Sequence, residues 1–149
     1  MSDIERAVAA IHPVPEISAL DVAQALGRGD GVLFDVRDRQ EFEMSHLPGA
    51  INIDPGMTAE RFLSEHGRGL EGRSAVFYCS VGIRSAIMLK RIVPSIARYR
   101  ATAAYNLRGG IFRWFAEDRD IVNATGSATM IHPYDEAWRG LFQRTLDAR

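Results

Sequence analysis

Residues 75–85 read Ala-Val-Phe-Tyr-Cys-Ser-Val-Gly-Ile-Arg-Ser, and the rest of the fold can be worked out from this stretch. Its first four residues form a short apolar run with an aromatic end, which is typical of a buried strand in a parallel sheet. Gly82 allows the backbone to turn, and the residues from Arg84 to Arg91 favour a helix. The sequence therefore predicts a strand, a tight loop and a helix, with Cys79 at the carboxyl end of the strand.

Cys79 is the only cysteine in the chain, and it occupies the position of a reactive thiol. Backbone N–H groups of the loop can point at its sulfur, and the following helix adds the positive end of its dipole. Both effects favour the thiolate over the thiol and make the sulfur a better nucleophile. In most proteins a lone buried cysteine is an inert apolar side chain, so this alternative stands beside the catalytic one.

Helices and strands are predicted to alternate on both sides of Cys79. Besides the strand that ends at Tyr78, strands are expected at 32–36, 50–53 and 102–105, and helices at 3–11, 18–26, 40–44, 58–65 and 110–117. Such alternation is typical of an α/β fold whose parallel sheet is covered by helices on both faces. Ligands of these folds bind at the carboxyl ends of strands, where Cys79 and Asp35 are both expected.

The chain is expected to form one domain over residues 1–122, with its core at about 16–120. Residues 123–130 are small and polar, as in a connector. An extra amphipathic helix is predicted from Pro133 towards the C-terminus, because its apolar side chains share one stripe. Residues 123–149 thus supply a connector and a helix that packs on the domain or forms the contact of a homodimer.

The composition excludes several classes of protein. A net charge of −1 argues against nucleic acid or a charged membrane as the main partner. One cysteine excludes an intramolecular disulfide framework, and no cysteine–histidine spacing resembles a zinc site. No segment has the pattern of a signal peptide or a membrane span, so a cytoplasmic location is expected, where the thiol stays reduced. Neither a metal nor an organic cofactor is implied.

Three blocks of sequence resemble the single-domain rhodanese family. They contain Asp-Val-Arg followed by His-Leu-Pro-Gly-Ala (within residues 34–53), Cys-Ser-Val-Gly-Ile-Arg-Ser (79–85) and Asn-Leu-Arg-Gly-Gly (106–110). The blocks occur in the order found in the family. The resemblance implies a rhodanese-like parallel sheet and a sulfurtransferase in which Cys79 carries a sulfane sulfur as a persulfide.

The resemblance also implies partners and roles around Cys79. The donor would be a small anion such as thiosulfate, or a persulfide or polysulfide, and the acceptor cyanide, a small thiol or a protein thiol. Arg84 would bind the sulfonate end of the donor, because its planar fork matches oxyanions. The apolar loop side chains Val81 and Ile83 favour a less polar or protein-bound donor. The loop N–H groups that would hold donor and persulfide belong to Ser80, Val81, Gly82, Ile83, Arg84 and Ser85.

Four residues of the first block are predicted to support the site rather than react. Arg37 and Glu41 are four residues apart, and an ion pair is expected between them. Asp35 is expected to cap backbone or to orient a loop arginine. His46 is expected to form structural hydrogen bonds, because no general base is needed once the thiolate has formed.

Two alternatives remain open. Cysteine phosphatases and arsenate reductases use a similar strand, loop and helix, but usually with five residues between cysteine and arginine. Here residues 80–83 supply four, and the shorter loop encloses a space better suited to one sulfur than to a tetrahedral oxyanion. Rhodanese-like domains can also serve as binding or regulatory modules, usually after losing the cysteine, whereas Cys79 is present.

Overall fold

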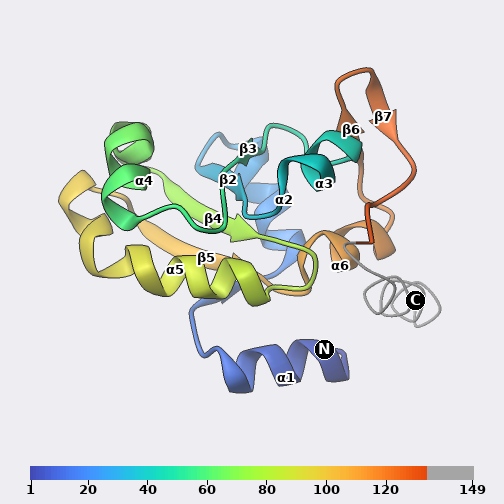
Figure 1. Ribbon diagram of the computed structural model, residues 1–149, viewed down its shortest axis with the longest axis horizontal. Coiled ribbons are helices and arrows are strands. Elements are labelled where there is room, and N and C mark those ends of the chain that lie inside the picture. Colours follow the sequence, from blue (N-terminus) through green and yellow to red (C-terminus); the bar gives the residue numbers. More distant parts are fainter. Residues whose placement is uncertain (134–149) are drawn as a thin grey trace.

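The computed structural model describes residues 1–133, so the expected C-terminal helix, and with it the expected dimer contact, lies outside the described residues. At its centre is a five-stranded parallel sheet with the order β1-β5-β4-β2-β3 (Figure 1). The predicted α/β class with a parallel sheet is therefore confirmed. The strands are β1 (Glu16–Ile17), β2 (Gly31–Asp35), β3 (Ile51–Asn52), β4 (Ser74–Tyr78) and β5 (Ala103–Leu107).

Helices cover both faces of the sheet, as the sequence predicts. Successive side chains of a strand point to opposite faces, and in β4 this places Tyr78 and Phe77 in different cores. Tyr78 packs with side chains of α2 (Ala19–Gly27) and α6 (Gly110–Ala116). Phe77 packs with α4 (Ala59–His66) and α5 (Ile83–Ile96) on the other face. Short 3-10 helices follow α4 (Gly67–Leu70) and α5 (Ala97–Tyr99).

Residues 123–130, predicted to be a connector, overlap a further element. Strands β6 (Ile121–Asn123) and β7 (Gly126–Ala128) form an antiparallel hairpin. At its turn Asn123 accepts a hydrogen bond from the backbone N–H of Thr125 at 2.9 Å. Backbone bonds of 2.9 Å in both directions also join Val122 to His46, directly after α3 (Arg39–Met44). Three-residue strands leave too short a pattern to be recognised in the sequence.

Helix α1 (Asp3–Ile11) lies outside the two helical layers, below the loop that joins β4 to α5 (Figure 1). Ser2 and Glu5 form a capping box at its first turn. Val8 is buried and faces Gly82 in that loop. Within residues 1–133, no helix combines the length and the apolar composition needed to cross a membrane.

Candidate active site

Cys79 lies directly after β4, and only 1% of its surface is exposed. The backbone N–H of Gly82 donates a hydrogen bond to Cys79 Sγ at 3.2 Å. Gly82 is the N-cap of α5 and has a φ of 108°, which residues with a side chain rarely adopt. The bond and the N-terminal end of α5 both stabilise negative charge on the sulfur. This is the strand, loop and helix that the sequence predicts.

Ser85 and Asn106 hold the other side of the loop. The Ser85 hydroxyl lies 3.4 Å from Cys79 Sγ and donates to Asn106 Oδ1 at 2.6 Å. One hydroxyl hydrogen cannot serve both acceptors at once. When the sulfur is a thiol, the Ser85 oxygen can accept the thiol hydrogen, and when the sulfur is charged, the hydroxyl can turn its hydrogen to the sulfur. Asn106 also donates from Nδ2 to the carbonyl of Gly82 at 3.0 Å. Asn106 is thus a positioning residue for the loop.

Asn106 is not among the predicted site residues, although it begins the third block that resembles the family. Asn106 lies within β5 and is 1% exposed. An amide in a buried strand must find hydrogen-bond partners, and its place near the carboxyl end of that strand suggests where they lie. This signal could have drawn attention to it.

The N-terminus of α6 packs directly on the loop backbone. The N–H groups of Ile111 and Phe112 donate to the carbonyls of Cys79 and Ser80 at 3.0 and 3.2 Å. Gly109 and Gly110 both have positive φ, as expected for a tight turn. Gly110 has a second function, because a Cβ there would lie 2.4 Å from the carbonyl oxygen of Ser80 and 2.5 Å from that of Cys79.

We expect Gly110→Ala to destabilise the fold by about 2–4 kcal/mol and to slow any reaction at Cys79, because the added methyl group pushes α6 away from the loop. Urea unfolding and the rate of Cys79 alkylation measure the two effects. Gly72→Ala is the matched control: Gly72 also has a positive φ, but open space surrounds its Cβ position. Equal losses in the two variants would show that backbone strain alone, and not the contact with the loop, is responsible.

Arg84 lies in the first turn of α5 and is bound on two sides. Its two terminal nitrogens donate to the Glu41 carboxylate at 2.8 and 3.0 Å, and Nη2 also donates to Ser80 Oγ at 3.0 Å. The predicted ion pair between Arg37 and Glu41 is therefore wrong. Arg37 precedes α3, whose N-cap is Asp38, and so cannot share a helical face with Glu41.

The partners of Glu41 keep its carboxylate charged. Burial alone would raise the pKa of Glu41, but the bidentate contact with Arg84 and the backbone N–H of Asp38 lower it below its ordinary value. The pair joins α3 to the first turn of α5 over 43 residues of sequence. Its effect is to fix Arg84 at the edge of the loop.

Asp35, Arg37 and Tyr78 form a buried polar cluster beside the site. Arg37 donates to both Asp35 carboxylate oxygens at 2.9 and 2.8 Å and to the carbonyl of Ser45 at 2.7 Å. The Tyr78 hydroxyl donates to Asp35 Oδ2 at 2.6 Å and accepts from the N–H of Leu47. The arginine that Asp35 orients is therefore Arg37, and not an arginine of the Cys79 loop.

His46 forms a hydrogen bond within the first block, as expected. Its Nδ1 donates to the carbonyl of Phe42 at 2.8 Å, and its ring stacks on the Phe42 ring with centroids 3.8 Å apart. Its backbone pairs with Val122. His46 thus ties the end of α3 to the hairpin.

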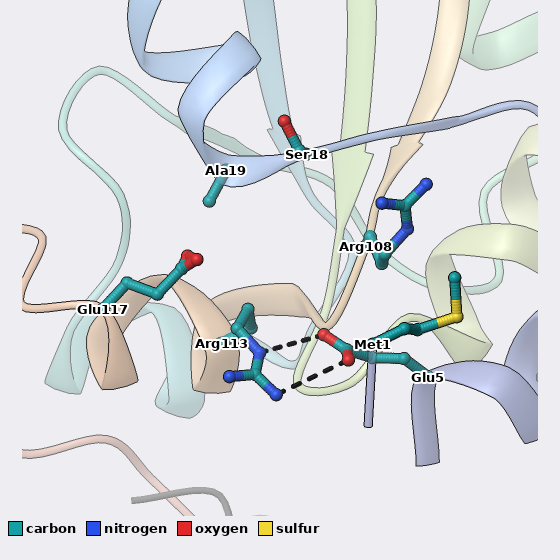
Figure 2. A pocket seen from close by; sticks show the side chains of 7 residues that line it. All are labelled: Met1, Glu5, Ser18, Ala19, Arg108, Arg113 and Glu117. Carbon is teal, nitrogen blue, oxygen red and sulfur yellow. Dashed lines mark hydrogen bonds and ion pairs between the residues drawn. The ribbon is translucent and has the colours of Figure 1, made fainter. Parts of the chain in front are cut away.

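Helix α1 is attached beside the loop by one ion pair. Figure 2 shows Arg113 of α6 reaching the Glu5 carboxylate, with contacts of 3.0 and 3.5 Å. Burial alone would raise the pKa of Glu5, but the Ser2 backbone and Arg113 lower it. Glu5 and Arg113 line a polar pocket together with Arg108 and Glu117, and the volume of this pocket is about 210 Å³ (Figure 2). Through this contact α1 is held against α6, whose N-terminus packs on the Cys79 loop.

Comparison with known proteins identifies the family. The model of the rhodanese-like domain matches residues 18–117. The human single-domain sulfurtransferase TSTD1 is 27% identical, with a TM-score of 0.52 over 68% of this chain and 96% of its own. A thiosulfate sulfurtransferase from Pseudomonas aeruginosa is 19% identical and shares the fold, with a TM-score of 0.65 over 97% of this chain and 26% of its own.

The curated relatives are longer proteins. The probable adenylyltransferase/sulfurtransferase MoeZ of Mycobacterium tuberculosis is 35% identical over 86 residues, which are 55% of this chain and 19% of MoeZ. The matches span between 16% and 32% of the length of such relatives.

Proposed function

This chain belongs to the rhodanese-like domain family, and from that premise we propose that it is a sulfurtransferase that carries a sulfane sulfur on Cys79. One observation supports the proposal most strongly: Cys79 Sγ lies at the carboxyl end of β4 and accepts the N–H of Gly82. A thiolate held in this way is a nucleophile, and the Gly82 N–H can also stabilise the terminal sulfur of a persulfide.

The first step transfers sulfur to the protein. The Cys79 thiolate attacks the outer sulfur of the donor, a new S–S bond forms, and the bond between that sulfur and the rest of the donor breaks. With thiosulfate the leaving group is sulfite, which departs with the electron pair. With a persulfide or polysulfide it is a thiolate or a shorter polysulfide.

The second step transfers the sulfur to an acceptor. A cyanide ion or a thiolate attacks the outer sulfur of the persulfide, and Cys79 leaves as a thiolate. Each step exchanges one bond to sulfur, so no external oxidant or reductant is consumed. The two half-reactions predict ping-pong kinetics.

The surroundings of Arg84 favour a donor that lacks a sulfonate group over thiosulfate. A sulfonate would compete with Glu41 for the fork of Arg84, because both terminal nitrogens already face that carboxylate. Glu41 is 1% exposed and stays charged, so leaving it without Arg84 would be costly. Persulfides and polysulfides need no such exchange.

Intact-protein mass spectrometry after brief incubation with thiosulfate, and separately with a polysulfide, tests the proposal. We expect a gain of one sulfur atom that cyanide or a reductant removes, with faster loading from the polysulfide. The Cys79→Ser variant is the control and should gain nothing. If neither donor loads the protein, the proposal fails and a binding module becomes the better interpretation. Hydrolysis of a phosphate ester without sulfur loading would favour a phosphatase.

A further inference from the structure

An apolar hollow of about 190 Å³ opens between α1 and the Cys79 loop. An apolar cavity of about 150 Å³ is large enough to hold benzene. The hollow therefore has room for a small organic group. It is lined by Ile4, Ala7, Val8, Ile11 and His12 from α1 and its end, by Val81 from the loop and by Ile83 at the start of α5.

The hollow adjoins the residue that binds the sulfur. Val81 and Ile83 stand on either side of Gly82, whose N–H donates to Cys79 Sγ. Val8 is 3.5 Å from the position that a Cβ of Gly82 would occupy. A persulfide would extend about 2 Å beyond Sγ. A molecule seated in the hollow thus contacts Val81 and Ile83, the two neighbours of Gly82, and Gly82 donates the hydrogen bond to the reacting sulfur.

The lining favours a hydrocarbon group. Six of its seven side chains are hydrocarbon, and Ile11 leaves 69% of its surface exposed at the rim. The nearby charged side chains bind elsewhere: Glu5 binds Arg113, and Arg84 binds Glu41. At the end of α1, His12 Nδ1 lies 3.3 Å from Lys90 Nζ, so the one polar group of the lining stands beside a cation.

From this placement we infer that the hollow binds the organic part of the sulfur acceptor, and that the acceptor is a small thiol with an apolar body about the size of a phenyl ring. The inference rests on the proposed function. The thiolate of the acceptor attacks the outer sulfur of the Cys79 persulfide, a new S–S bond forms, and the bond to Sγ breaks. The products are an organic persulfide and the Cys79 thiolate.

The test compares acceptors on the preloaded full chain. Phenylmethanethiol is the apolar probe, 2-mercaptoethanol is a polar thiol of similar acidity, and cyanide is too small to need the hollow. We expect kcat/KM for phenylmethanethiol to exceed that for 2-mercaptoethanol by about tenfold or more, because the ring leaves water on binding.

Two variants of α1 locate the effect. Ala7→Phe fills the hollow and should lower kcat/KM for phenylmethanethiol by about tenfold while changing the value for cyanide less than about twofold. Ala10→Phe places the same ring on the same helix at an exposed position outside the lining, and should change neither value. An equal loss with cyanide in Ala7→Phe, or equal rates for the two thiols in the wild type, would overturn the inference.

An unreactive probe separates this inference from the proposed function. Benzyl methyl sulfide has the same ring but no thiol, and we expect it to shift the methyl NMR signals of Ile11 and Ile83 in the wild type and in Ala10→Phe but not in Ala7→Phe. Sulfur loading without these shifts would overturn the hollow as the acceptor site and leave the proposed function standing. Shifts without sulfur loading would overturn both sulfur-transfer claims and leave only a ligand site.

Discussion

The Cys79→Ser variant is expected to lose at least about a thousandfold of the sulfur-transfer rate, since removing a nucleophile leaves only binding and electrostatic stabilisation. A serine hydroxyl is far less acidic than a thiol and is not a stable carrier of sulfur. The substitution removes one soft atom from a buried position and keeps a group that Gly82 and Ser85 can bond. We therefore expect the free energy of unfolding to change by less than about 1 kcal/mol.

Initial rates with thiosulfate and with a polysulfide as donors, cyanide as acceptor and thiocyanate as product measure this loss. Urea unfolding checks that the variant is folded. Ser85→Ala is the matched control: it removes the other side chain near Sγ, but keeps the thiol and the Gly82 N–H, so its loss of rate should be far smaller than that of Cys79→Ser. Turnover of Cys79→Ser within tenfold of the wild type would contradict a persulfide on Cys79.

Local signals in the sequence predict the helices well. Ser18 and Thr58 are the N-caps of α2 and α4, and each accepts the backbone N–H three residues later at 3.1 Å. Such caps act within one turn, so the sequence alone contains both partners. The loop at Cys79 is predictable for the same reason, since strand, glycine and helix follow one another within 11 residues.

Contacts between distant segments are not predictable in this way. Glu41 binds Arg84 across 43 residues, and the spacing of charges along the chain instead suggests Arg37 as its partner. Arg37 in fact pairs with Asp35, two residues away at the end of β2. Placing α1 over Val81 likewise needs the tertiary structure, since amphipathic pattern shows that a helix has an apolar face but not what covers it.

The buried ion pair of Asp35 and Arg37 should matter more for stability than any other charged pair in the described residues. Both side chains are fully buried, with 0% exposure. Burial by itself lowers the pKa of Arg37, but the contacts with Asp35 more than reverse this, so the guanidinium stays charged. Burial, together with the Asp35 charge, raises the pKa of Tyr78, which therefore stays neutral and donates to Asp35.

Arg37→Met is therefore expected to lower the free energy of unfolding by about 3–5 kcal/mol, because it leaves the Asp35 carboxylate buried without its cation. Urea unfolding monitored by circular dichroism measures the loss.

Arg39→Met makes the same substitution in the exposed pair with Glu43, where the side chains are 86% and 59% exposed, and should cost less than about 1 kcal/mol. Adding Asp35→Leu to Arg37→Met removes the stranded charge and should recover part of the loss, since an apolar replacement of both partners is often tolerated. If Arg37→Met and Arg39→Met lowered the free energy of unfolding equally, the buried Asp35–Arg37 pair would contribute no more to stability than an exposed pair.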